Sequence, residues 1–166
     1  MAVAEIELAG LGPRVLDPED PAAREATEHL LGADVLVISS PTYEASYSGL
    51  LKSFLDRIGH QGLTGKAAVM IMLGGLPSHQ LAVNLHFAPL LLELGAMVPA
   101  GGLFVLESDV DDFSSFAVTW AQAHAAALAA ASRAAVSRGA AATSCSTTGC
   151  RLSTPTTRRA RCQTWD

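Results

Sequence analysis

Residues 35–56 read VLVISSPTYEASYSGLLKSFLD and are the most informative part of the sequence for the fold. Its first part, residues 35–38, is an apolar, largely β-branched run typical of a buried strand. Its last part, residues 49–56, carries apolar residues at the spacing of one helix face. A strand therefore delivers the polar loop 41–48 to the edge of a sheet, and a helix leaves from it. Open α/β sheets bind ligands at this carboxyl edge.

Similar units follow along the chain. We predict strands at residues 3–8, 67–73 and 97–106, the last broken by Gly101 and Gly102. We predict helices at residues 21–31, capped by Asp20, and at 49–58, 78–94 and 108–132. Pro89 should kink the third helix because proline lacks a backbone donor. Strands that alternate with helices indicate βαβ units and a parallel sheet, and therefore an α/β fold.

Charge divides the chain into two parts. The chain has 166 residues and a net charge of -5, which fits one domain. Up to residue 132, five basic side chains stand against fifteen acidic ones, which argues against a nucleic-acid partner. From Arg133 onward, six arginines stand against Asp166 alone. We therefore predict a domain over residues 1–132 and a disordered basic Ser/Thr/Arg-rich tail over 133–166.

Several other kinds of protein are disfavoured. Residues 67–92 carry no formal charge, but their glycine, proline, histidine and asparagine residues are unsuited to a membrane span. All three cysteines, Cys145, Cys150 and Cys162, lie in the predicted tail without a nearby histidine, so we expect no metal site. No secretory signal opens the sequence, and we expect a cytoplasmic protein.

The string PTYEASYSGLLKSFLD at residues 41–56, with Gly74 and Gly75 after the next strand, resembles the NADPH-dependent FMN reductases of the flavodoxin-like fold. The nearest likeness is to reductases that supply reduced FMN to alkanesulfonate monooxygenases. The resemblance extends over residues 3–125. It implies a flavodoxin-like three-layer sandwich that transfers hydride from NADPH or NADH to FMN. It also implies a homo-dimer or tetramer that packs through the helix at 78–94.

The resemblance also assigns the site. It places the loop 41–48 at the flavin ring and the glycine pair beside the reactive edge of the ring, with no catalytic acid or base. On the residues alone, Pro41 is a turn residue, Tyr43 is ordinary packing and a Gly-Gly pair is a turn. The residues that the resemblance assigns to cofactor binding are Pro41, Thr42, Tyr43, Glu44, Ser46, Gly74 and Gly75.

One departure from the family pattern concerns the start of the sheet. Such reductases begin with a strand and a Ser/Gly/Arg-rich loop that wraps the FMN phosphate, whereas this sequence matches from the second strand onward. We therefore expect an N-terminally truncated domain whose first strand is missing, residues 3–8 paired directly with 35–39, and weak FMN binding. The alternatives are a non-catalytic remnant, a small electron carrier, and a quinone or azo-dye reductase.

Overall fold

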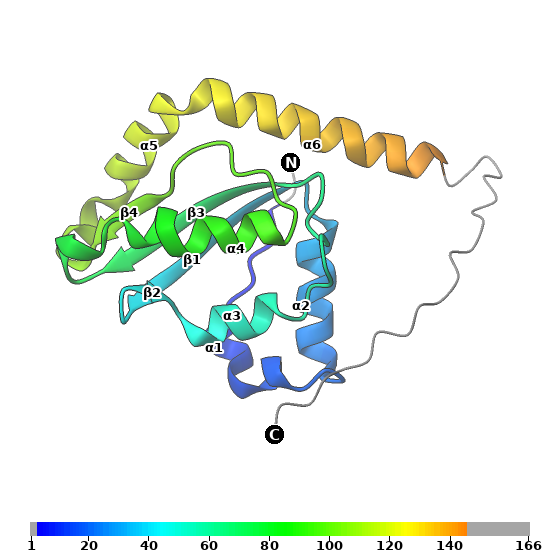
Figure 1. Cartoon of the computed structure of the whole chain (residues 1–166), viewed down its shortest axis with the longest axis horizontal. Coiled ribbons are helices and arrows are strands. Elements are labelled where there is room, and N and C mark those ends of the chain that lie inside the picture. Colours follow the sequence, from blue (N-terminus) through cyan, green and yellow to red (C-terminus); the bar gives the residue numbers. More distant parts are fainter. Residues whose placement is uncertain (1–2, 146–166) are drawn as a thin grey trace.

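A four-stranded sheet forms the centre of the computed structural model, which describes residues 3–145 and the side chains of residues 3–137. Strands β1 (Val35–Tyr43), β3 (Ala67–Gly74) and β4 (Leu103–Leu106) are parallel, and the order is β2-β1-β3-β4. The short β2 (Ser46–Tyr47) folds back antiparallel onto the end of β1. The predicted α/β fold with a parallel sheet is confirmed (Figure 1).

Helices cover both faces of the sheet, as a three-layer sandwich requires (Figure 1). Along β1 and β3, buried residues alternate with more exposed ones, and the buried residues, such as Ile38 and Met70, share one face of the sheet. The buried row packs against α2 (Pro21–Gly32), α3 (Gly49–Leu55) and α4 (Ala88–Glu93). On the other side, α6 (Ala125–Cys145) contacts β3. Burial of small, aliphatic and aromatic side chains holds the helices against the sheet.

Side-chain caps start two of the predicted helices, at the predicted Asp20 and at Ser48, for which no cap was predicted. Asp20 accepts a hydrogen bond from the Ala23 amide at 2.9 Å, and Pro21 occupies the first turn of α2. This amide and, secondly, the Arg14 guanidinium lower the pKa of Asp20 below its usual value. Ser48 caps α3 in the same way, through the Leu51 amide at 3.2 Å. Asp20 and Ser48 accept hydrogen bonds from first-turn amides that have no partner within the helix, and they therefore fix where both helices start.

The predicted strand at residues 3–8 is wrong. Residues 3–7 belong to no regular element, and α1 (Leu8–Leu11) and a 3₁₀ turn η1 (Gly12–Leu16) follow. Ile6 packs against the core between Glu5 and Glu7, and this segment lies beside α2. The separated apolar residues Ile6, Leu8 and Leu11 hold the segment against the core but do not make it a strand.

The outer edge of β1 consequently lacks the expected partner. Among residues 3–145, no strand pairs with β1 on that side before Thr42, where β2 begins to pair. Val37 is 66% exposed and Val35 is also exposed, so this part of the sheet is uncovered. An unpaired, apolar strand edge favours association with other strands.

The segment between β3 and β4 is more broken than predicted. A 3₁₀ turn η2 (Pro77–His79) and a π-helix η3 (Val83–Phe87) precede α4. The Ala88 amide bonds to the Val83 carbonyl, the wide spacing of a π turn, and Pro89 lies in the first turn of α4, where its missing donor is tolerated. The predicted kink is therefore a π turn before Pro89. Of the strand predicted at 97–106, Leu103–Leu106 forms β4, and Met97 makes a single bridge to Ala67.

The C-terminal helix is longer than predicted. After a 3₁₀ turn η4 (Glu107–Asp112), α5 (Phe113–Ala123) ends at His124, and α6 then continues to Cys145. The predicted boundary at residue 132 therefore falls inside a helix, because alanine favours helix and Ala131 and Ala135 are buried. The rest of the predicted tail, with Cys150 and Cys162, lies outside the described residues. No helix within residues 3–145 combines the length and apolar character needed to cross a bilayer.

We expect Ala135→Asp to destabilise the protein and Val136→Asp to leave it nearly unchanged. Ala135 is 2% exposed, whereas its neighbour Val136 is 55% exposed on the same helix. A buried unpaired carboxylate should cost about 2 kcal/mol or more, and a surface change about 0.5 kcal/mol or less. Urea unfolding measures both variants. Equal losses of stability would show that α6 does not pack as described.

Candidate functional site

β1 and β3 end side by side at the carboxyl edge of the sheet. Their parallel register runs from Val35 opposite Ala67 to Pro41 opposite Leu73, so Thr42 and Gly74 come next. A Cβ placed at Gly74 would lie 3.1 Å from the Thr42 Oγ1 and 2.8 Å from the Phe104 Cζ. Only glycine therefore fits between these two side chains without a shift of its neighbours.

Thr42 carries an unusual polar atom. Its Oγ1 is buried and has no hydrogen-bond partner among the residues that the structure describes. Buried hydroxyls in proteins nearly always have a partner, and an unpaired one needs an explanation. A ligand that brings a donor or acceptor to this edge would satisfy it.

Ser40 closes the loop that follows β1. It is 3% exposed, and its hydroxyl accepts from the Ser48 amide at 2.9 Å while donating to the Pro41 carbonyl at 2.8 Å. Ser48 in turn caps α3, so one side chain joins the end of the strand to the start of the helix. The sequence prediction did not assign a role to Ser40. Its position in the alternation of β1 was the signal, because it falls on the face of Leu36 and Ile38.

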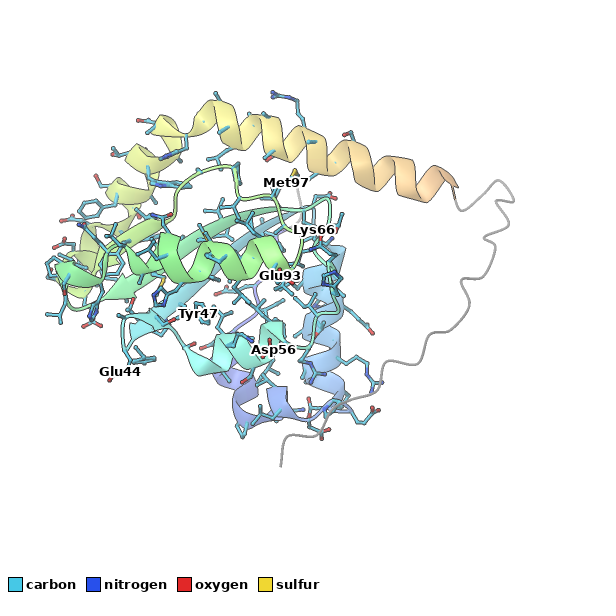
Figure 2. The ribbon with its side chains drawn as sticks, viewed as in Figure 1. Glu44, Tyr47, Asp56, Lys66, Glu93 and Met97 are labelled. Atoms are coloured by element: carbon cyan, nitrogen blue, oxygen red, sulfur yellow. The ribbon has the colours of Figure 1, made fainter. Side chains whose placement is uncertain are left out.

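The tip of the loop is a tight two-residue turn between Tyr43 and Ser46. Glu44 and Ala45 have positive φ angles of 47° and 59°, as a type I′ hairpin turn requires. Non-glycine residues pay a steric cost in this region, and such strain concentrates at functional sites. Figure 2 shows Glu44 at the tip, pointing away from the body of the protein.

The two tyrosines of the hairpin have different environments. Tyr47 packs against Phe87 of the π-helix with ring centroids 5.5 Å apart, whereas Tyr43 is 64% exposed. Ser46 Oγ lies 3.2 Å from His86 Nδ1 on the same π-helix. The π turn therefore anchors one side of the hairpin and leaves the ring of Tyr43 free for a ligand.

On the β4 side of Gly74, the edge is acidic and slightly hollowed. A Cβ at Gly75 would lie 3.5 Å from the Glu107 Oε2, an ordinary contact. A shallow depression of about 160 Å³ is smaller than a typical ligand pocket. It is lined by Pro77, Gln80, Phe104, Val105, Leu106, Asp109 and Phe116. Sequence reasoning missed Phe104 and Glu107. Their spacing in the sequence does not indicate that β4 pairs with β3 beside Gly74.

The structure brings together some of the predicted site residues. Thr42 and Gly74 touch, and Gly75 is exposed next to them. Pro41 and Tyr43 flank Thr42 with exposed side chains, and the depression does not include them. Glu44 projects from the turn, and Ser46 contacts His86. We expected Pro41, Thr42, Tyr43, Gly74 and Gly75 to converge on one shallow cleft. They instead lie along an open edge, and the hollow is on the β4 side. No group of three metal-ligating side chains occurs among residues 3–137.

Comparisons with known proteins agree on one family. A family model described as NADPH-dependent FMN reductase matches residues 1–111. The FMN reductase (NADPH) of Escherichia coli K12 is 38% identical over 95 residues, which are 57% of this chain and 50% of that protein. The NADH-dependent FMN reductase SfnE of Pseudomonas putida is 30% identical over 121 residues, 72% of this chain and 61% of that protein. The chain spans about half the length of the first of these relatives.

Solved structures give the same picture. The apo form of the NADH:FMN oxidoreductase EMOB is 31% identical with a TM-score of 0.66, and the match covers 74% of this chain and 68% of EMOB. An oxidoreductase of Corynebacterium diphtheriae is 27% identical with a TM-score of 0.65, and covers 82% of this chain and 76% of its own.

The two neighbouring glycines should differ sharply in their tolerance of alanine. We expect Gly74→Ala to destabilise the protein by about 1–3 kcal/mol, because the new methyl group overlaps Phe104 and Thr42. Gly75→Ala should change stability by about 0.5 kcal/mol or less, because it meets only the end of Glu107. Thermal or urea unfolding of both variants measures the difference. A tolerated Gly74→Ala would contradict the close approach of Thr42, Gly74 and Phe104.

Proposed function

Because the chain belongs to the NADPH-dependent FMN reductase family and has a flavodoxin-like fold, we propose that it works in hydride transfer from a nicotinamide nucleotide to FMN at the carboxyl edge of β1 and β3. The observation that carries this proposal is the unpaired Thr42 hydroxyl beside a glycine that cannot carry a side chain. A buried polar atom and bare backbone at a strand edge suit a flat ligand with polar ring edges.

The residues of the edge fit the ring side of FMN. Thr42 offers its hydroxyl, Gly75 offers exposed backbone, and Tyr43 offers an exposed aromatic face. Bound FMN supplies the redox chemistry that side chains lack, so the chain needs to position and shield rather than to donate protons. We propose the following contacts to FMN: Pro41, Thr42, Tyr43, Glu44, Ser46, Gly74 and Gly75.

The phosphate side of FMN fits less well. No lysine or arginine lies among the described residues of the loops 41–48, 74–80 and 107–112. Charge-assisted hydrogen bonds contribute about 1.5–3 kcal/mol each, so their scarcity should weaken binding. We therefore propose that this chain binds FMN weakly. On the family resemblance alone, we also propose a cytoplasmic protein whose reduced FMN serves a flavin-dependent monooxygenase.

Thr42→Val tests the proposed site. The variant keeps the shape of the side chain and removes the unpaired hydroxyl, so the protein should be as stable as before or more stable. FMN affinity of Thr42→Val should fall about 3- to 10-fold, which corresponds to the loss of one hydrogen bond. Thr42→Ser keeps the hydroxyl and should bind FMN as tightly as the parent chain. Quenching of FMN fluorescence measures affinity, and absorbance at the NAD(P)H band measures oxidation with saturating FMN.

Two outcomes would contradict the proposal. If FMN at millimolar concentration shows no saturable quenching and supports no NAD(P)H oxidation, the chain is the non-catalytic alternative. If FMN binds but Thr42→Val leaves the affinity unchanged, the flavin forms no hydrogen bond with Thr42.

We further propose that the π-helix and α4 pack against a second copy of the chain. Three large apolar side chains are exposed here: Leu81 in the turn before the π-helix, Leu85 in the π-helix and Leu92 in α4. Their neighbours Val83, Phe87 and Leu91 are buried in the chain's own core, so only part of the predicted apolar surface is available. A row of exposed leucines on one segment marks a contact surface.

Leu85→Gln should shift the protein towards the monomer. The substitution places an amide in the centre of the proposed contact, whereas Leu16→Gln changes an equally exposed leucine on η1. Analytical ultracentrifugation over micromolar concentrations measures both variants against the parent chain. A parent chain that sediments only as a monomer, or an equal effect of Leu16→Gln, would contradict this assignment.

A further inference from the structure

The carboxyl edge of the sheet carries negative charge without a partner. Glu44 lies at the tip of the hairpin, Glu107 lies against Gly75, and Asp109 lines the depression. Asp111 and Asp112 follow in the same 3₁₀ turn, η4. None of these five carboxylates forms an ion pair with a described residue. Two histidines, His79 and His86, lie on the elements next to this edge.

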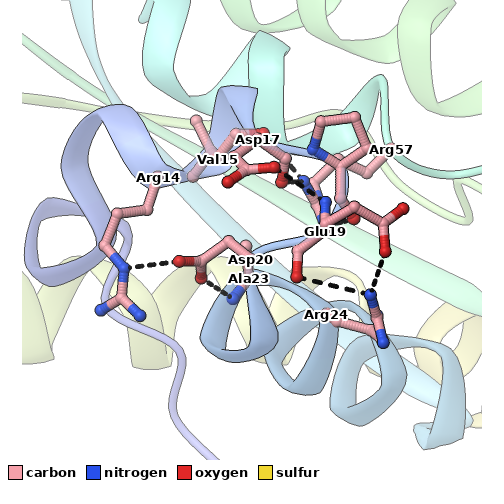
Figure 3. Close-up of polar contacts among 9 residues, drawn as sticks. Arg14, Val15, Asp17, Glu19, Asp20, Ala23, Arg24 and Arg57 are labelled. Atoms are coloured by element: carbon pink, nitrogen blue, oxygen red, sulfur yellow. Dashed lines mark hydrogen bonds and ion pairs between the residues drawn. The ribbon is translucent and has the colours of Figure 1, made fainter.

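The arginines before α6 are engaged with η1 and α2. Arg14 pairs with Asp20 at 2.8 Å and Arg24 pairs with Glu19 at 2.9 Å (Figure 3). Arg57 donates to the carbonyls of Val15 at 3.1 Å and Asp17 at 2.7 Å. These contacts tie the guanidinium groups to one layer of helices and turns.

The two lysines are also engaged. Lys66 precedes β3 and donates to the Ala33 carbonyl at 2.8 Å, and Figure 2 shows it at the end of the sheet opposite Glu44. Lys52 pairs with Asp56 one turn further along α3. Arg133 lies within α6, two turns after its start. The charges of the described edge are therefore five carboxylates with no lysine or arginine among them.

We infer that this chain discriminates against the 2′-phosphate of NADPH and uses NADH as its hydride donor. This inference rests on the proposed function. The two nucleotides differ by one phosphate group, which carries about two negative charges at neutral pH. Sites that select this phosphate hold it with arginine or lysine, and the described edge offers neither.

The size of the effect follows from simple electrostatics. A carboxylate that lies one screening length, roughly 8–10 Å, from the extra phosphate repels it by a small amount in water, and the repulsion by several carboxylates adds up. Together they should reduce kcat/KM for NADPH about tenfold relative to NADH. The difference should shrink as salt is added, because exposed charges are screened.

The test compares the two nucleotides on the chain loaded with saturating FMN. We expect kcat/KM to be about tenfold higher for NADH at low ionic strength, and the ratio to fall as salt rises. The double variant Glu107→Gln, Asp109→Asn should lower the ratio about threefold by removing two of the five charges. The control Glu25→Gln, Glu28→Gln removes two exposed carboxylates from α2 and should leave the ratio unchanged. Calorimetric binding of NAD⁺ and NADP⁺ gives the same comparison without turnover.

The outcomes separate this inference from the proposed function. Oxidation of NADPH at an equal or higher kcat/KM overturns the inference and leaves the reductase assignment standing. A ratio that responds equally to the α2 control also overturns it, because the effect would then come from net charge and not from this edge. If neither nucleotide binds or is oxidised, the proposed function fails, and the inference fails with it.

Discussion

The parallel pairing of β1 with β3 sets the geometry of both the core and the candidate site. Seven residue pairs fix its register, from Val35 with Ala67 to Pro41 with Leu73. A slip of one residue would turn every side chain of a strand to the opposite face, so burial of Ile38 and Met70 specifies the register. The same register brings Thr42 to Gly74. The geometry of the candidate site is therefore a consequence of core packing.

Ser40 fixes the loop relative to the end of β1. Among the described residues, Ser40 is the only polar residue that is buried as a whole, and both hydrogen bonds of its hydroxyl go to the loop that it closes. Ser48 then passes the constraint to α3 as its cap. The hairpin is held from the other side by packing of Tyr47 on Phe87. The strained turn at Glu44 and Ala45 persists because both of its ends are fixed.

The parts of the fold that could be predicted are those with strong local signals. The apolar runs of β1 and β3, the Asp20 cap and the polar loop between strand and helix all follow local rules. The convergence of Thr42 and Gly74 was also predictable, because parallel strands end at one edge. The assignment of these residues to a flavin remains a prediction that rests on family resemblance.

The failures have physical causes that lie outside local sequence. Residues 3–7 contain Ile6 between two glutamates, and their packing beside α2 decided their conformation. The helix predicted to end at residue 132 continues to Cys145, because Ala131 and Ala135 are buried in α6, which contacts β3. Pro89 was expected to bend a helix, and the chain instead widened to a π turn before it. Glu107 lies beside Gly75 because β4 pairs with β3, a contact that local sequence does not reveal.

The order in which the strands join has a consequence for how the chain folds. Val35 pairs with Ala67 and Ile71 pairs with Leu103, so both parallel contacts connect residues 32 positions apart. Each strand can therefore dock on the one before it as soon as a single helical crossover is complete. Contacts of this moderate separation favour faster folding than pairings between distant ends of a chain. During synthesis, β1 and β3 can form a unit before α5 and α6 emerge, and the last helix then covers a sheet that already exists.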